Sequence, residues 1–345
     1  MAEHSSRAVS PAAIVPTSVA GVPIGRMVEA LSPRMLDIGA RGGADEAMLP
    51  IAWASRIVCF EPDPAEAAGL ARTGDPRWRE FTVLPFAVGG VTGPQELHVP
   101  MDAEGASLLV HNPDMIERFG SAHLHDPLKT IPVETWTLND LQSAGHIDRI
   151  DYMKVDVEGA ELDILRAGTS VLADCVALKV ECSFLHQRID QPLIWDVAQF
   201  LEGIGFEVLD LQGLHRWRRR NLPSHPYRVR STMPYSRGQV AQCDLTLLKS
   251  ATHLRDQEQA LRLVLVSAAL GFFDYAITVL RKNPELAGAA TSQWGLNLEV
   301  ELQRWSAATG ERVVKKALAE SVRALVPLIR AWAGRLPFPT PRVPY

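Results

Sequence analysis

The chain has 345 residues, 47% of them hydrophobic and 22% charged, and this composition excludes an intrinsically disordered protein. The net charge of −5 combines an acidic body, with 15 basic and 31 acidic residues over 1–210, and a segment over 211–243 that holds seven arginines and no acid. One short basic segment argues against general nucleic-acid binding. The charge-free core of the most apolar segment, 263–273, is shorter than the roughly 20 residues that a transmembrane helix needs.

The first predicted elements form one nucleotide-binding unit. An apolar strand leads into Asp37-Ile-Gly39, and two more glycines follow at 42 and 43. A helix is expected over 45–53, followed by a second apolar strand that ends in Glu61. This order of a strand, a glycine turn, a helix and a strand that ends in an acid is typical of one half of an open α/β sheet. The glycines let the backbone pass close to a ligand, and the acid can accept both hydroxyls of a ribose.

The residue at position 37 indicates which nucleotide binds. Dinucleotide sites have glycine at this place in the turn, whereas here it is Asp37. A carboxylate repels a pyrophosphate but suits the amino group and sulfonium of S-adenosylmethionine. The turn therefore favours S-adenosylmethionine and disfavours a nicotinamide oxidoreductase. The alternative is an ordinary strand–helix–strand unit whose glycines only make turns.

The rest of the sheet follows in chain order. Strands are predicted over 80–88, 95–99, 131–138, 176–181, 205–210 and 243–249, and residues 150–159 are expected to form a strand that runs into a turn. Helices are expected from 139, over 160–167 and over 193–204. The last two strands are separated by the arginine-rich segment, and they fit an antiparallel hairpin that closes the edge of the sheet.

The pattern becomes helical from residue 254, with two further helices expected over 296–305 and 313–332 and a proline-rich tail. We expect an N-terminal arm over 1–29, an α/β domain over 30–250 and a C-terminal all-α region over 251–345. Apolar stretches such as 322–332 could form a homodimer contact.

The four cysteines, Cys59, Cys175, Cys182 and Cys243, lie in or beside apolar runs and have no C-x-x-C spacing. We expect buried free thiols rather than disulfides or a zinc site. The N-terminus has prolines at 11, 16 and 23 and lacks the charged and apolar regions of a signal peptide. These features predict a cytoplasmic protein.

Several motifs together resemble one family. They are Asp-Ile-Gly-Ala-Arg-Gly-Gly at 37–43, Phe-Glu-Pro-Asp-Pro at 60–64, Phe-Ala-Val at 86–88, Ala-Ser-Leu at 106–108, Thr-Leu-Asn-Asp-Leu at 137–141 and Met-Lys-Val-Asp-Val-Glu-Gly-Ala-Glu at 153–161. Over residues 33–250 the chain resembles the FkbM-type S-adenosylmethionine-dependent methyltransferases. Arg41 stands where that family usually has asparagine.

The resemblance implies an α/β, Rossmann-like class I methyltransferase fold, with a mostly parallel seven-stranded sheet and helices on both faces. It also implies O-methylation with S-adenosylmethionine as cofactor, the acceptor being a hydroxyl of a sugar, a glycan or a natural product. Arg41 and the added C-terminal helices leave an alternative open. In that alternative, the protein is a non-catalytic scaffold in glycan or natural-product assembly.

The expected cofactor site lies at the ends of the first three predicted strands. Asp37 and Gly39 are expected at the methionine end, Glu61 at the ribose, and Ala87 and Val88 beside the adenine. The other expected cofactor residues are Ala40, Arg41, Gly43 and Pro62. The alternative for Asp37 is that it only caps the following helix.

The expected catalytic residues are Asp156, Glu158 and Glu181, which follow or end neighbouring strands. Asp156 would orient the acceptor hydroxyl or take its proton. Clustered carboxylates could also bind a divalent ion, but such clusters arise structurally too, and we assign no metal. Glu158 could instead cap the helix that begins at Gly159. Lys154 is expected to pair with one of these acids.

The expected substrate-binding residues are Arg218, Arg220 and His111. The arginine-rich segment would suit a phosphate-bearing acceptor, because a guanidinium group can form bidentate hydrogen bonds with a phosphate. The alternative is a solvated loop that pairs with the acidic body. His111 shares its loop with His123 and His125, whose spacing lacks the pattern of a metal site.

Overall fold

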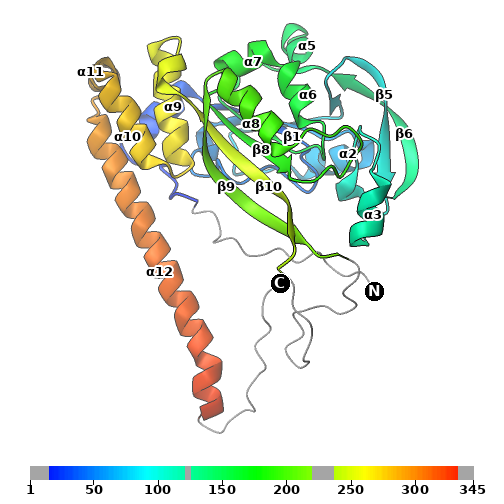
Figure 1. Ribbon diagram of the computed structural model, residues 1–345. Coiled ribbons are helices and arrows are strands. Elements are labelled where there is room, and N and C mark those ends of the chain that lie inside the picture. The colour runs from blue at the N-terminus through cyan, green and yellow to red at the C-terminus, as the bar shows by residue number, and fades with distance from the viewer. Residues whose placement is uncertain (1–14, 121–125, 220–236, 333–345) are drawn as a thin grey trace.

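The computed structural model describes residues 15–120, 126–219 and 237–332, with side chains up to residue 321. A seven-stranded sheet forms the centre of the molecule (Figure 1). In sheet order its strands are β3 (Glu80–Leu84), β2 (Arg56–Phe60), β1 (Arg34–Ile38), β7 (Tyr152–Val155), β8 (Ala177–Ser183), β10 (Gln239–Lys249) and β9 (Phe206–Trp217). The first five are parallel, and β10 is antiparallel to both of its neighbours. The predicted edge hairpin is confirmed.

Helices cover both faces of this sheet. The described helices are α1 (Gly25–Leu31), α2 (Pro64–Thr73), α3 (Pro113–Phe119), α5 (Leu138–Ser143), α6 (Glu161–Arg166), α7 (Thr169–Asp174), α8 (Ile194–Gly203), α9 (Gln257–Ala269), α10 (Phe273–Lys282), α11 (Pro284–Trp294) and α12 (Leu298–Trp332), of which α10, α11 and α12 pack on other helices. Neighbouring residues of a strand point to opposite faces. Met35 accordingly packs with α1 and α9, and Leu36 packs with α5 to α8. The expected class I methyltransferase fold is confirmed.

A second, three-stranded sheet lies beside the first. It consists of β4 (Ala87–Val88), β6 (Pro127–Trp136) and β5 (Gly93–Pro100). The single strand expected over 80–88 is therefore wrong, because β3 ends before Pro85 and the chain then enters the other sheet. Proline has no N–H to donate to a ladder, which explains the break.

The helix expected over 45–53 is also wrong. The segment forms turns and one short 3₁₀ helix, η1 (Ala52–Ala54). Asp45 is used in tertiary contacts: its N–H donates to Asp37 Oδ2 at 2.7 Å, and its carboxylate accepts from Lys179 and from the Tyr152 hydroxyl. Helices α1 and α9 cover this face of β1 and β2 instead.

The two helices expected over 296–305 and 313–332 are one continuous helix, α12. Gly310 lies within it, and a helix tolerates one such glycine at a cost of about 1 kcal/mol. The described part of the N-terminal segment packs against this helix, since Trp305 Nε1 donates to Thr17 O at 2.7 Å. The domain boundary expected at residue 250 stays a prediction, although α9 shares one hydrophobic cluster with β1 and β2.

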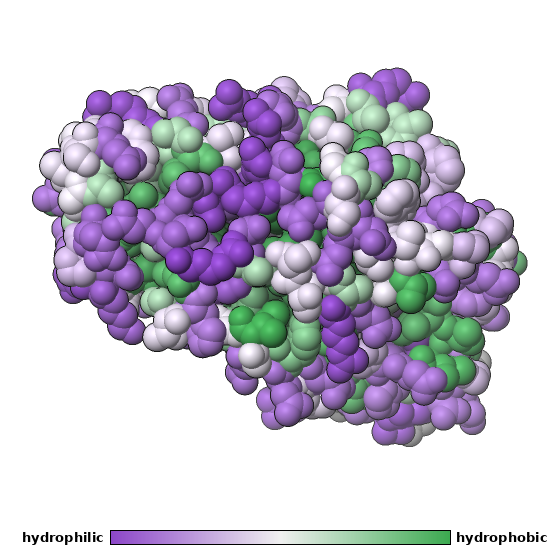
Figure 2. All heavy atoms as spheres, turned by 90° about the horizontal axis from the view of Figure 1, so that it is seen from above, coloured by the Kyte–Doolittle hydropathy of each residue, from purple (hydrophilic) through white to green (hydrophobic). Residues whose placement is uncertain are grey.

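The surface and the cysteines agree with a folded α/β protein. All four cysteines are free and buried, as predicted. Figure 2 shows the molecule from above, and on this face hydrophilic residues divide the hydrophobic ones into separate patches. Within the described ranges, we find no helix with both the length and the apolar character that crossing a membrane would take.

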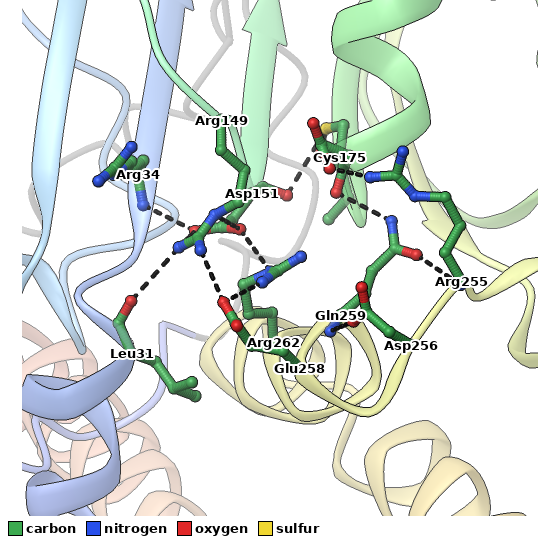
Figure 3. Close-up of polar contacts among 12 residues, drawn as sticks. Leu31, Arg34, Arg149, Asp151, Cys175, Arg255, Asp256, Glu258, Gln259 and Arg262 are labelled. Carbon is green, nitrogen blue, oxygen red and sulfur yellow. Dashed lines mark hydrogen bonds and ion pairs between the residues drawn. The ribbon is translucent and has the colours of Figure 1, made fainter.

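A buried ion-pair network fastens α9 to the start of β7 (Figure 3). Asp151 is fully buried, and its Oδ2 accepts the Arg34 N–H at 2.9 Å. Arg262 Nε of α9 lies 2.9 Å from Asp151 Oδ1, and Arg149 lies beside the same carboxylate. Burial raises the pKa of Asp151, and the two guanidinium groups oppose that rise.

Replacing Arg262 by methionine is expected to lower the free energy of unfolding by about 3 kcal/mol, because it leaves a buried carboxylate with one cation fewer. Urea denaturation followed by circular dichroism measures the change. Lys315→Met is the matched control: it removes an ion pair with Glu311 in which both side chains are exposed, and it should cost at most about 1 kcal/mol. Equal losses in the two variants would show that the network does not hold α9.

Candidate active site

A pocket of about 420 Å³ opens at the carboxyl ends of the parallel strands. Open α/β sheets bind their ligands at this edge, and the volume lies within the range of about 300–1,000 Å³ typical of small-molecule sites. Most of the predicted site residues line it: Gly39, Arg41, Glu61, Pro62, Ala87, Val88, Asp156, Glu158 and Glu181. These nine residues therefore gather around one pocket, and their functional roles stay predictions.

Six predicted residues are not in the pocket wall or cannot be placed. Asp37, Ala40 and Gly43 are described, but they do not line the pocket. His111 is buried and forms a backbone bridge with Arg188, which does line it. Arg218 follows β9 outside the wall, and Arg220 lies outside the described residues.

Gly39 forms the turn at the end of β1. Its φ is +86°, and a Cβ at this position would lie 1.8 Å from the carbonyl oxygen of Asp156. The turns after β1 and β7 are this close because Asp156 N–H donates to Ile38 O at 3.0 Å. Only glycine fits such an approach, and the result is a narrow backbone cradle at the floor of the pocket.

Asp37 lies beneath this cradle rather than in the pocket. It is 1% exposed, and burial raises its pKa to about 6 against the opposing effect of Lys154. Lys154 Nζ lies 3.5 Å from Asp37 Oδ1 and 3.2 Å from Asp156 Oδ2, and it donates to Gly39 O. The predicted pairing of Lys154 with a site acid is confirmed. This lysine thus joins the β1 turn to Asp156.

Glu61 presents a carboxylate at the end of β2. The residue is 3% exposed, and its Oε1 accepts the Asp63 N–H at 2.8 Å. Arg41 Nη2 lies 3.5 Å from the same oxygen and 3.3 Å from Asp63 Oδ2. Burial raises the pKa of Glu61, while the Asp63 N–H and Arg41 lower it. Apolar residues line the adjoining wall: Phe60, Phe86, Ala87 and Val88.

The three predicted catalytic acids lie together at the other end of the pocket. One carboxylate oxygen from each of Asp156, Glu158 and Glu181 lies within 4.8 Å of the others. Glu158 pairs with the buried Arg188 at 2.7 Å, and Glu181 Oε1 accepts from Gln242 Nε2 at 2.7 Å. Asp156 is paired with Lys154, so each of the three acids has a protein partner.

Burial and like charge together set the protonation of Glu181. Burial raises the pKa of Glu181 well above its ordinary value, and the charges of Asp156 and Glu158 add to the rise. The raised pKa extends the pH range over which Glu181 is protonated, and a protonated carboxyl group can donate a hydrogen bond. Glu158 does not cap the next helix, because the N-cap of α6 is Ala160 and has no side-chain hydrogen bond. Glu161 Oε1 instead accepts the N–H groups of Val157 and Gly159 in the turn before the helix.

Sequence reasoning missed most of the acid-side wall. The missed residues are Leu97, Glu104, Gly105, Ala106, Leu108, Gln187, Arg188, His215, Trp217, Gln242 and Asp244. They come from the small sheet, the loop after β8 and the β9–β10 hairpin. Two signals in the sequence pointed to this wall: the Ala-Ser-Leu motif at 106–108, noted without a role, and the arginine-rich segment, which contains His215 and Trp217. The other missed residues carry no motif and meet only through the fold.

Comparisons with known proteins place these observations in context. Residues 37–208 match the methyltransferase FkbM domain. The chain is 31% identical over 203 residues to the 2-O-methyltransferase NoeI of Sinorhizobium fredii (strain NBRC 101917 / NGR234), a match covering 53% of this chain and 81% of NoeI.

Two solved structures are also similar. Magnesium protoporphyrin IX methyltransferase (ChlM) from Synechocystis PCC 6803 with bound SAM has a TM-score of 0.31 and 13% identity, covering 66% of this chain and 81% of that one. The O-methyltransferase from Bacillus cereus in complex with SAH has a TM-score of 0.28 and 14% identity, covering 68% and 84%.

Proposed function

The chain belongs to the FkbM methyltransferase family and is an S-adenosylmethionine-dependent O-methyltransferase, and from this premise we propose that it methylates a hydroxyl group of a sugar or glycan. The observation that carries the proposal is the composition of the pocket's acid end. There, carboxylates and amides lie beside one tryptophan. These groups accept hydrogen bonds from hydroxyls, and the indole ring offers an apolar surface to the carbon–hydrogen face of a sugar.

The donor set at the other end fits S-adenosylmethionine. The two oxygens of Glu61 suit the two neighbouring hydroxyls of a ribose, and the apolar wall that includes Ala87 and Val88 suits adenine. The cradle at Gly39, with Arg41 beside it, would hold the methionine end. Bound there, the cofactor supplies an activated methyl group on a positively charged sulfur. We assign Asp37 an indirect part, through Lys154.

The charge of the acid end favours a neutral acceptor. The wall there contains five carboxylic acids, Glu104, Asp156, Glu158, Glu181 and Asp244. Of the cations that line the pocket, Arg188 is paired with Glu158 and Lys154 with Asp156. A phosphate in this space would meet net repulsion. The role expected for Arg220 falls outside the described residues and stays a prediction.

In this site Asp156 would take the proton of the acceptor hydroxyl, and Glu181 would donate a hydrogen bond to a neighbouring oxygen. The protein otherwise has to align the hydroxyl with the methyl group and to exclude water. Positioning of this kind can supply about 7–11 kcal/mol of the barrier. The four buried thiols further support a cytoplasmic location.

Methyl transfer to matched acceptors tests the proposal. We expect label from methyl-labelled S-adenosylmethionine to enter neutral oligosaccharides and not the same oligosaccharides carrying phosphate. Mass spectrometry would place the methyl on oxygen, and the 2-hydroxyl is the first position to inspect because NoeI is named a 2-O-methyltransferase. Label confined to phosphorylated acceptors would contradict a neutral acceptor. Cofactor binding without transfer to any acceptor would favour the scaffold alternative.

A further inference from the structure

The far half of α12 leaves the body of the protein. At its start, Leu298, Leu302 and Trp305 are buried, and Thr309 is 5% exposed. From residue 312 to 321, all side chains except the half-buried Val313 are exposed. Figure 1 shows the helix running well beyond the helices it packs against. A helix of this length without tertiary contacts gains little stability from propensity alone.

The exposed part of α12 carries apolar residues on the side away from the body. Val314 is 58% exposed and Leu318 is 61% exposed. Val314 lies nine residues after Trp305, and Leu318 lies nine residues after Thr309. Nine residues make two and a half helical turns at 3.6 residues per turn. Their side chains therefore lie opposite the buried ones, where no described part of the same chain covers them.

One three-residue pattern, a basic residue followed by alanine and an apolar residue, recurs every seven residues in this half. Lys-Ala-Leu at 316–318 is followed by Arg-Ala-Leu at 323–325 and Arg-Ala-Trp at 330–332. Val314, Leu318 and Ser321 are spaced four and three apart, as are the two core positions of a heptad. Apolar residues spaced alternately four and three apart are typical of a helix that winds around another helix.

We propose that the segment over 312–332 of α12 pairs with the same segment of a second copy of this chain. The basic residues support this occupant: Arg312 and Lys316 lie on the face opposite Val314 and Leu318, so they would point outward from the pair. An apolar face resting on lipid needs no seven-residue repeat. This inference goes beyond the proposed function and does not depend on it.

The mass of the full chain in solution tests the pairing. Light scattering after size exclusion should give about twice 37.9 kDa for the unaltered chain. The double variant Val314→Gln/Leu318→Gln should run as a monomer, because polar amides replace the apolar core positions. Lys316→Gln/Glu320→Gln is the matched control, changes two exposed residues outside that apolar face, and should stay dimeric.

Three results would overturn the proposal. The first is a monomeric unaltered chain at every concentration tested. The second is a Val314→Gln/Leu318→Gln variant that remains dimeric. The third is a monomer that sediments with vesicles of phosphatidylglycerol and phosphatidylcholine, which would assign the surface to lipid. Cofactor binding measured in the same samples should be equal in all variants, so failure here would leave the methyl-transfer proposal intact.

Discussion

Replacing Asp156 by asparagine is expected to lower kcat by about 10²- to 10⁴-fold, the usual contribution of a positioned general base. Asparagine has the same shape but cannot take the proton of the acceptor hydroxyl. The dissociation constant for S-adenosylmethionine should change by less than about threefold, because the lost interaction would act only on the acceptor. Steady-state kinetics with an identified acceptor and calorimetry with the cofactor measure the two quantities.

The contacts of the three acids explain why we assign the role of general base to Asp156 rather than to Glu158 or Glu181. Glu158 is in an ion pair with the buried Arg188. Glu181 Oε1 already accepts a hydrogen bond from Gln242, and burial raises the pKa of its carboxyl group. Asp156 is paired with Lys154 at 3.2 Å and still lines the pocket.

Asp163→Asn is the matched control, since Asp163 is an exposed carboxylate on α6 close in sequence to the site. It should keep the kcat of the unaltered protein. An Asp156→Asn variant with unaltered kcat would remove Asp156 from the proton transfer and leave that role to another group.

The strands could be predicted because their pattern is local. Buried parallel strands are short apolar runs, and β1, β2, β7 and β8 all stand out as such runs in the sequence. The acids at their carboxyl ends, Glu61, Asp156 and Glu181, could be placed in one site because parallel strands end at the same edge of a sheet. This logic located the pocket from four separate stretches of chain.

The helix expected over 45–53 failed because its first residue has distant partners. Asp45 looks like a good helix start, but Lys179 and Tyr152 hold its carboxylate. Both partners lie more than 100 residues away in the sequence, so no local pattern contains them. The same limit applies to α9, which was expected in a separate region and packs on the sheet.

The acid-side wall could not be predicted for a related reason. Arg188 follows β8, and Asp244 and Gln242 belong to β10, so these side chains meet Glu158 and Glu181 only after the hairpin has closed the sheet. The sequence pattern also did not predict the orientation of the Asp37 side chain. An aspartate before the glycine turn suggested contact with a ligand, whereas in the structure it pairs with Lys154 beneath the floor.

Replacing Glu61 by alanine is expected to weaken S-adenosylmethionine binding by about 100-fold or more, because two hydrogen bonds to a charged carboxylate are worth about 3–6 kcal/mol together. The unaltered protein should also bind more weakly as the pH falls. Burial raises the pKa of Glu61, and below that pKa the protonated acid loses one of its acceptor positions. Affinity is thus fully present above the raised pKa and is lost as the pH falls through it.

Calorimetry across an acidic pH series measures both effects. Glu61→Gln should bind weakly at every pH and lose the acid dependence, since an amide does not titrate. Asp63→Asn is the matched control: it lies beside Arg41 but outside the pocket wall, and it should leave affinity within about threefold. Tight, pH-independent binding by Glu61→Gln would mean that the ribose is held elsewhere, and Arg41 would then be the first residue to test.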